Sequence, residues 1–114
     1  MANTVFAKIL RGEIPAELLH DDEHCIAFRD INPQAPVHVL VIPRKEIVSI
    51  ESLEDGDAAL LGHLMCVARD VARKEGVAED GYRLVINNGA HAGQTVFHLH
   101  IHVLGGRTMG WPPG

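Results

Sequence analysis

The stretch Phe97-His98-Leu99-His100-Ile101-His102-Val103 decides how this sequence is interpreted. In a β-strand, successive side chains point to opposite faces, so the apolar residues of this stretch share one face and its histidines share the other. We expect the apolar face to pack against the core beneath a helix. The three imidazoles would then line the opposite face of the same strand.

Two uses of this histidine row other than catalysis stay open. The residues could be the exposed polar face of a half-buried strand, although such faces usually draw on Lys, Glu, Thr and Ser. They could also bind zinc, since histidine is the commonest metal ligand. At about 3.3 Å per residue, however, His98 and His102 start about 13 Å apart. One zinc ion holds its nitrogens at about 2.0–2.1 Å, so we expect no metal requirement, although a two-histidine site completed by His38 or His91 stays open.

The third use of the row is catalysis by imidazole. A free imidazole has a pKa of about 6.5, so the central His100 would be largely neutral and nucleophilic at neutral pH. A neighbouring imidazolium could donate a proton to a leaving group. Just upstream, Gly93-Gln94-Thr95-Val96 offers successive backbone amides and one hydroxyl, which suit a phosphate. A phosphate cradle that leads into three aligned histidines favours phosphoryl or nucleotidyl transfer.

Size and composition limit the remaining classes. With 114 residues, 46% of them hydrophobic, the chain can form one domain over residues 1–114. A formal charge of −5 is the wrong sign for holding nucleic acid by its phosphates. Cys25 and Cys66 stand alone rather than in a disulfide framework, which is typical of a reduced compartment. Without a secretory leader or an apolar run of about 20 residues, we expect a soluble cytoplasmic protein with no membrane or nucleic-acid partner.

Local patterns predict an α+β domain with an antiparallel sheet. The expected elements, in chain order, are a helix at 5–11, strands at 17–20 and 24–28 joined as a hairpin, a central strand at 37–42, a helix at 52–75, and strands at 82–86 and 96–104. In the long helix, apolar residues from Leu60 to Ala72 occupy an arc of about 160°. A helix on one core needs a stripe of about 100°, so this helix is either deeply seated or meets a second surface.

The histidine row and four further stretches resemble one known family. His98 to Leu104 has the His-φ-His-φ-His-φ-φ pattern of the histidine-triad superfamily, where φ is an apolar residue. The other matching stretches are Phe28–His38, Gly81–Arg83, Gly93–Phe97, and the ending from Leu104 through Trp111-Pro112-Pro113-Gly114. They are similar to the Hint branch (histidine triad nucleotide-binding proteins), and the resemblance covers almost the whole chain.

The resemblance implies a HIT-like α+β subunit with a five-stranded antiparallel sheet, one long helix and a short N-terminal helix. Two subunits would form a homodimer with a continuous sheet, and the tail at 105–114 would lie across or near the partner's site. The implied activity is hydrolysis of the P–N bond of purine nucleoside 5′-phosphoramidates, and of aminoacyl- or lysyl-adenylates, with no cofactor. The alternatives are a nucleotide-binding regulatory module, a zinc-binding interaction protein and a dinucleoside polyphosphate hydrolase.

The resemblance also implies a role for each histidine of the row. His100 would be the nucleophile, forming a nucleotidyl-histidine that water then hydrolyses. His102 would contact the phosphate and the leaving group, while His98 together with His38 would orient the set. The histidines that match nothing catalytic, and that we expect on the surface, are His20, His24, His63 and His91.

Further residues would hold the nucleotide. Asp30 would accept both ribose hydroxyls, as an ionised carboxylate can, although a turn residue before Asn-Pro is an alternative. The implied base pocket is Ile14, Phe28, Ile31 and Leu40, and the implied α-phosphate site is Asn87, Gly93, Thr95 and Val96. Trp111 would anchor the tail, since an aromatic residue can cap a pocket. For His38 and the apolar pocket residues, a plain core position is the alternative.

Overall fold

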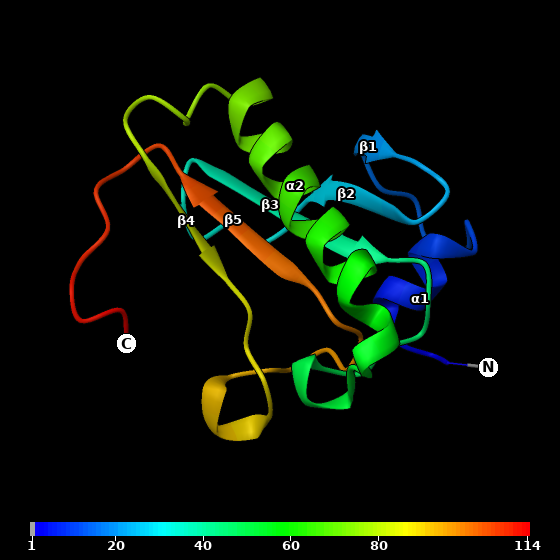
Figure 1. Ribbon diagram of the computed structural model, residues 1–114. Helices are drawn as coiled ribbons and strands as arrows, with labels where there is room; N and C mark the ends of the chain where they lie inside the picture. Colours follow the sequence, from blue (N-terminus) through cyan, green and yellow to red (C-terminus); the bar gives the residue numbers. More distant parts are fainter. Residues whose placement is uncertain (1) are drawn as a thin grey trace.

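The computed structural model describes residues 2–114 (Figure 1). Its helices are α1 (Val5–Leu10) and α2 (Ala58–Lys74). Its strands are β1 (Leu18–Asp21), β2 (Cys25–Arg29), β3 (Val37–Pro43), β4 (Tyr82–Val85) and β5 (Ile101–Gly105). Three short 3-10 turns complete the described elements, namely η1 (Ile50–Ser52), η2 (Asp55–Asp57) and η3 (Ala90–Ala92).

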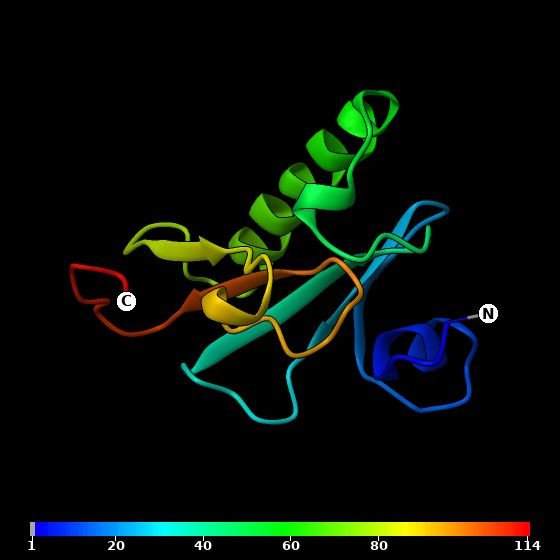
Figure 2. The same ribbon diagram turned by 90° about the horizontal axis from the view of Figure 1, so that it is seen from below.

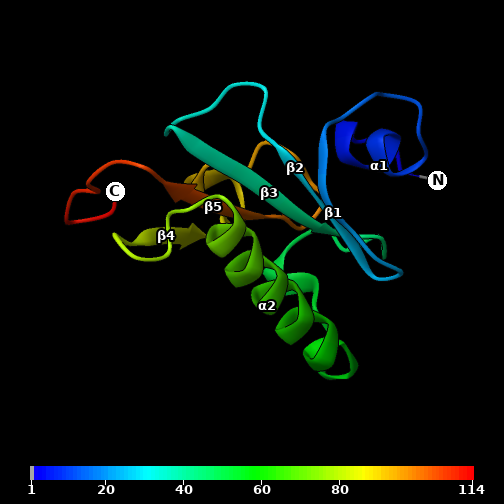
Figure 3. The same cartoon turned by 90° about the horizontal axis from the view of Figure 1, so that it is seen from above.

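The strands form one antiparallel sheet in the order β1-β2-β3-β5-β4, which confirms the expected α+β class. β3 lies at the centre, as its run of β-branched and apolar residues predicts, and it is buried from His38 to Pro43. A strand that is apolar at consecutive positions must be covered on both faces. Figures 2 and 3 show that α2 covers one face of the sheet and that α1 lies on the other side.

Alternating side chains divide the interior into two clusters. On the α2 face, Val39 and Val41 of β3 pack with residues of the long helix such as Leu64. On the α1 face, the intervening Leu40 and Ile42 pack with Phe6, Ile26 and Phe28. Burial of each such side chain contributes about 1.5–3 kcal/mol, so the sheet is held from both sides. The histidines described below belong to the α1 face.

The long helix begins at Ala58 and not at Ser52 as predicted. Ser52 closes a turn instead, because its hydroxyl accepts the N–H of Ser49 at 2.9 Å and its own N–H donates to the Ser49 carbonyl at 3.2 Å. Asp57 closes the next turn by accepting the N–H of Glu54 at 3.1 Å. Short polar side chains compete with the helix for these backbone groups, so the first regular helical turn forms only after them.

The last strand begins at Ile101 and not at Val96, so only the third histidine of the row lies within it. The cause is Pro43, the last residue of β3, which has no N–H to donate to the segment running beside it. The N–H of Leu99 does not supply a ladder bond either, since it donates to the carbonyl of Ile47 at 2.6 Å. The segment before Ile101 therefore runs beside the sheet without joining its hydrogen-bond ladder.

The predicted alternation of the row holds from Leu99 onward. Leu99, Ile101 and Val103 are buried in the cluster beneath α2, as expected. Phe97 was expected beside them but is 51% exposed, because it precedes the point at which the segment joins the sheet.

The outer side of α2 keeps apolar residues that the sheet does not cover. Leu64 and Val67 face the sheet and are buried, whereas Met65 is 39% exposed. This part of the apolar arc is thus left uncovered by the sheet and is accessible to a second surface. Within residues 2–114, no helix is both long enough and apolar enough to cross a bilayer.

Candidate functional site

The three histidines of the row and His38 gather on the α1 face of the sheet. His102 lies on β5 and His38 on the adjacent strand β3. The ring centroids of His100 and His102 are 4.9 Å apart, and those of His38 and His102 are 5.2 Å apart. The structure thus brings together the residues predicted to be catalytic, although two of them lie outside any regular strand.

The hydrogen bond made by His100 determines which of its ring nitrogens is free. Its Nδ1 lies 2.7 Å from the carbonyl oxygen of His98, which can only accept, so Nδ1 carries the proton and donates it. In the neutral ring, Nε2 is then left with an unshared electron pair. Burial lowers the pKa of His100, which favours this neutral form. The ring is prepared to act as a nucleophile.

A chain of two hydrogen bonds fixes the tautomer of His102. The N–H of Gln34 donates to Nδ1 of His38 at 3.0 Å, so the proton of a neutral His38 is on Nε2. That Nε2 lies 2.9 Å from Nδ1 of His102 and donates to it. His102 therefore carries its proton on Nε2, where it can donate to a ligand. His100, with a free electron pair on Nε2, thus lies beside His102, with a free N–H donor on Nε2.

Burial and like neighbours keep His102 neutral. Burial has the largest effect, and the adjacent rings of His100 and His38 add to it, lowering the pKa of His102 to about 4. Asp30 opposes the shift and lies 3.5 Å from Nε2 of His38. The pKa of His38 is likewise lowered, chiefly by burial. At neutral pH the described tautomers are consequently the populated ones.

Both burial and a hydrogen bond hold the side chain of His98 in place. Its Nε2 donates to the carbonyl of Pro43 at 2.8 Å, and its side chain is almost completely buried. This bond holds the backbone of His98 where its carbonyl meets His100. Phe6 of α1 packs its ring edge-to-face against His100 at a centroid distance of 4.9 Å. Nothing in the sequence around Phe6 indicates this contact, because α1 is remote from the row in the chain.

The side chain of Gln94, a residue predicted to contribute only its backbone amide, organises the loop that precedes the row. It is buried, its Oε1 accepts the N–H of Gly89 at 2.8 Å, and its Nε2 donates to the carbonyls of Val48 and Val96 at 2.8 and 3.1 Å. Gly89 and Gly93 have φ of +82° and +88°, conformations that favour glycine. The glycines and the amide of Gln94 together fix the shape of the loop.

Only part of this loop can serve as the expected amide cradle. The N–H groups of Gly93 and Gln94 already donate to the carbonyls of Ala90 and Gly89, at 3.0 and 3.1 Å. Those of Thr95 and Val96 have no hydrogen-bond partner among the described residues. The cradle is therefore shorter than the four amides predicted, and it lies directly before the histidines.

The residues predicted to bind the nucleotide are placed unevenly. Phe28 and Leu40 lie in the α1-side cluster and Val96 packs against it, so these three share one apolar wall. Ile31 is fully exposed at the loop after β2, and Trp111 is 84% exposed in the tail. The remaining residues of the prediction are half-buried or exposed, namely Ile14, Asn87, Gly93 and Thr95.

Asp30 makes the turn contact considered for it and keeps part of its carboxylate accessible. Its Oδ1 accepts the N–H of Asn32 at 2.8 Å, which is the turn contact expected before Asn-Pro. Its Oδ2 lies near His38, and the side chain is 21% exposed. Because an ionised carboxylate has several acceptor positions, the turn contact leaves room for ribose hydroxyls.

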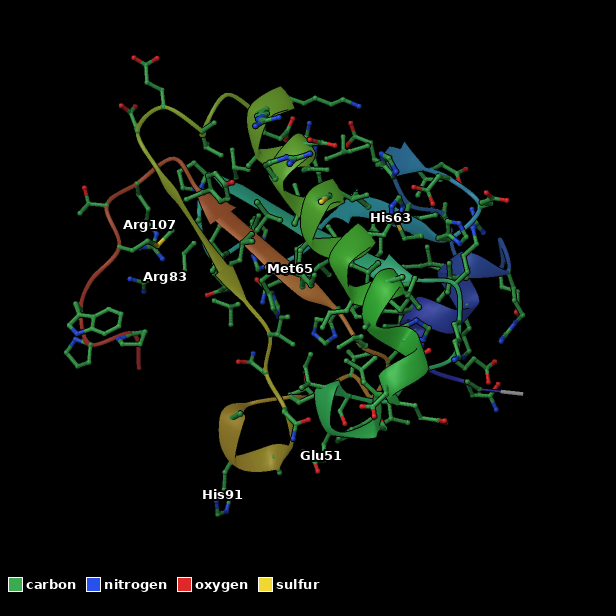
Figure 4. The ribbon with its side chains drawn as sticks, viewed as in Figure 1. Glu51, His63, Met65, Arg83, His91 and Arg107 are labelled. Atoms are coloured by element: carbon green, nitrogen blue, oxygen red, sulfur yellow. The ribbon has the colours of Figure 1, made fainter. Side chains whose placement is uncertain are left out.

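One trio in the site could also hold a metal ion. Ligand atoms of Asp30, His38 and His102 lie within 4.8 Å of one another. The two histidine nitrogens concerned are the ones joined by the hydrogen bond described above. Of the two residues expected to complete a two-histidine metal site, His38 lies in this trio beside His102, whereas His91 lies apart on the exposed turn η3 (Figure 4).

Comparison with known proteins agrees with this site. A family model described as the HIT domain matches residues 11–109. An uncharacterized HIT-like protein from Synechocystis sp. is 56% identical over 112 residues, which cover 98% of this chain and 97% of that protein. The crystal structure of a HIT family hydrolase from Legionella pneumophila is 50% identical with a TM-score of 0.95, covering 98% of this chain and 100% of that one. A histidine triad nucleotide-binding protein from Candida albicans is 30% identical with a TM-score of 0.82, covering 96% and 83%.

The fold and the site together define a histidine-triad protein, with three spaced histidines gathered on one face of a five-stranded sheet. The family model and the relatives complete the identification. This chain belongs to the HIT family.

Protonation of the buried imidazoles should weaken the fold. Because the pKa of His102 falls from 6.5 to about 4 on folding, the unfolded chain binds the proton more readily. The contribution of His102 to the free energy of unfolding is complete above the unfolded pKa and is lost as the pH falls toward the folded one. We expect denaturant unfolding to show stability that decreases from about pH 7 to about pH 4, and decreases less steeply in His102→Gln. Equal slopes for the two proteins would contradict the lowered pKa.

Proposed function

We propose that this protein hydrolyses purine nucleoside 5′-phosphoramidates, and aminoacyl- or lysyl-adenylates, through a nucleotidyl-histidine at His100. The observation that carries the proposal is the fixed tautomer of His100, which leaves a buried electron pair beside the His102 ring. The Legionella relative is described as a hydrolase and the Candida relative as nucleotide-binding. The third histidine and the Trp-Pro-Pro-Gly ending favour the Hint branch of the family.

In the first step, Nε2 of His100 attacks the α-phosphorus and forms a new P–N bond, while the bond from phosphorus to the leaving group breaks. In a phosphoramidate this is a P–N bond, and its electron pair stays on the amine nitrogen, which takes up a proton from solvent. In an adenylate it is a P–O bond, and its electron pair stays on the departing carboxylate. The Nε2–H of His102 donates a hydrogen bond to the departing group. The positive charge that develops on the His100 ring is stabilised through its Nδ1–H bond to the carbonyl of His98.

In the second step, water attacks the same phosphorus and releases its proton, and the bond from phosphorus to His100 breaks. The nucleoside monophosphate leaves and the neutral imidazole is restored. Splitting one displacement into two replaces a difficult attack by water with an attack by a better nucleophile. Each ring returns to its starting tautomer, because the bonds to Gln34 and to the carbonyl of His98 do not change.

Nucleotide contacts in this proposal follow the apolar wall and the loop. Phe28 and Leu40 support the base, and the base pocket also includes Ile14 and Ile31. Asp30 accepts the ribose hydroxyls. The α-phosphate lies against the free amides of Thr95 and Val96, with Asn87 and Gly93 at its edge. The chemistry uses no metal and no cofactor, because the imidazoles supply both the nucleophile and the donor.

Removal of the nucleophile should separate turnover from binding. We expect His100→Ala to lower turnover of adenosine phosphoramidate by several decades with little change in nucleotide affinity, because the attacking atom acts mainly in the transition state. His98→Ala and His102→Ala should slow the reaction less. Rapid quench of the wild type should trap an acid-labile adduct on His100. Near-normal turnover of His100→Ala, or an adduct on another histidine, would show that the nucleophile is wrongly assigned. Faster cleavage of diadenosine polyphosphates would instead place the protein in another branch.

The loss of nucleotide affinity on removing the ribose contact should depend on the sugar. We expect Asp30→Ala to weaken binding of adenosine monophosphate by about 10- to 100-fold, because a hydrogen bond to a charged group contributes about 1.5–3 kcal/mol. Binding of the 2′-deoxynucleotide should fall less, since it lacks one of the two hydroxyls. Calorimetric titration of both nucleotides measures the difference. Equal losses would mean that Asp30 does not contact the ribose.

We also propose a homodimer in which the sheet continues across a two-fold axis. The uncovered apolar side of α2, including Met65, and the edge strand β4 are the surfaces available for it. The tail is guided outward by Arg83, whose Nη2 donates to the carbonyl of Gly110 at 2.7 Å. In Figure 4 the tail runs away from the core on the β4 side. Its exposed Trp111 would then reach the partner's site.

Sedimentation and truncation test the dimer and the tail separately. We expect a dimer at micromolar concentration, and we expect a chain ending at Gly106 to change its ranking of amine leaving groups. A monomer in sedimentation would overturn the first proposal. An unchanged substrate ranking after truncation would overturn the second and leave the first standing.

A further inference from the structure

A second cluster of potential ligands lies apart from the histidine row, where the β1–β2 turn meets α2. His20 comes from β1, Asp22 from the turn, Cys25 from the start of β2 and His63 from the long helix. One nitrogen, oxygen or sulfur atom of each side chain lies within 4.8 Å of all the others. Figure 4 places His63 on the side of α2 that faces this hairpin. His20 and His63, which we expected on the surface, are half-buried, and both point into this cluster.

Asp22 is the centre of the cluster. Its Oδ1 is held by the N–H groups of His24 and Cys25, at 2.7 and 2.8 Å, which fixes the orientation of the carboxylate. Its Oδ2 then faces Nε2 of His20 at 2.6 Å and Nε2 of His63 at 2.7 Å. The thiol sulfur of Cys25 lies 3.6 Å from the same oxygen. Four potential metal ligands, from β1, the β1–β2 turn, β2 and α2, therefore lie close together.

We propose that His20, Asp22, Cys25 and His63 form a zinc site that joins the β1–β2 hairpin to α2. Two imidazoles, one carboxylate and one thiolate make up a four-ligand set of the kind that zinc prefers. Three of the four ligands are imidazole nitrogen or thiolate sulfur, which disfavours magnesium and calcium because these ions prefer oxygen ligands. All four ligands come from the protein, so the site is structural rather than catalytic.

The present distances suit a tetrahedral ion after small side-chain adjustments. Zinc binds nitrogen and oxygen at about 2.0–2.2 Å and sulfur at about 2.3 Å, so its ligand atoms lie roughly 3.3–3.6 Å from one another. The distances from Asp22 Oδ2 to the two nitrogens, 2.6 and 2.7 Å, must lengthen, while the distance to the sulfur, 3.6 Å, already fits. Side-chain exposures of 24% for His20, 25% for Asp22 and 38% for His63 leave the ion a path of entry.

The site would strengthen a contact between elements that otherwise meet through little surface. β1 is the edge strand of the sheet and its residues are exposed or half-buried. A metal that binds the folded chain alone stabilises it in proportion to its affinity and concentration. The ion would therefore hold the hairpin against the helix without taking part in the chemistry at His100.

Zinc titration of four proteins tests the ligand set. The proteins are the metal-free wild type, His63→Ala, the matched control His24→Ala, and His102→Ala. His24 is an exposed histidine in the same turn that is not one of the four ligands. Loss of a residue that only orients a ligand lowers metal affinity by about 10- to 100-fold, so loss of the ligand His63 should cost at least about 100-fold. We expect one zinc per wild-type chain and affinities within about threefold of wild type for both His24→Ala and His102→Ala.

Several outcomes would overturn the proposal. These are failure of the wild type to bind, unchanged binding in His63→Ala, equal loss in His24→Ala, or binding lost only in His102→Ala. The last result would move the ion to the Asp30, His38 and His102 trio. Cobalt substitution gives a second test that does not need a folded ligand variant. A thiolate-to-cobalt charge-transfer band should persist in Cys66→Ser, and its absence from the wild type would remove Cys25 from the set.

Turnover and heat stability separate this site from the catalytic one. We expect zinc to raise the melting temperature of the wild type and to leave that of His63→Ala unchanged. Turnover of metal-free wild type and of His63→Ala should stay within about twofold of the untreated protein, because no reacting group is touched. If chelation abolished turnover and zinc restored it even in His63→Ala, the metal would be catalytic. That result would contradict the metal-free mechanism.

Discussion

The hydrogen bond from Nε2 of His98 to the carbonyl of Pro43 is the contact on which the rest of the site depends. Pro43 ends its strand and has no N–H, so the neighbouring segment cannot continue the ladder and needs another attachment. The imidazole of His98 provides it. The carbonyl of His98 is thereby held where it accepts the proton of His100 Nδ1. One proline thus ends a strand and, through two hydrogen bonds, decides which ring nitrogen of His100 stays free.

The same burial that stabilises the fold also keeps the rings neutral. Phe6 covers His100, and burial is the main reason that the pKa values of His100 and His102 are lowered. A neutral ring can keep its electron pair, whereas a protonated ring would lose it and would also be costly to bury. Nucleophilicity and folding therefore make the same demand on these residues. A solvated histidine row on an open strand face would meet neither.

The sequence predicted the parts of the fold that local pattern controls. β3 could be placed at the centre because its own residues are apolar on both faces, and the alternation of Leu99 with Ile101 correctly assigned the core side of the row. The start of β5 could not be predicted, since it depends on Pro43 in another strand. Phe6 and Gln94 were missed for the same reason: the contacts that give them a role join segments remote in the chain.

Residues 2–114 include two clusters that contain histidine and aspartate and that residue type alone does not distinguish. Around His38 and His102, an N–H from Gln34 enters at one end, so each ring donates to the next and a proton is presented at the far end. Around Asp22, both rings point to a single carboxylate oxygen, and the second carboxylate oxygen is occupied by backbone amides. In the first cluster the hydrogen bonds form a chain that ends in an N–H donor, which suits proton and phosphoryl chemistry. In the second cluster the hydrogen bonds share one acceptor oxygen, and this convergence of ligand atoms suits a cation. The difference lies in where backbone N–H groups bind: in the first cluster one donates to a histidine nitrogen, and in the second two donate to a carboxylate oxygen. Only the fold brings these N–H groups into place.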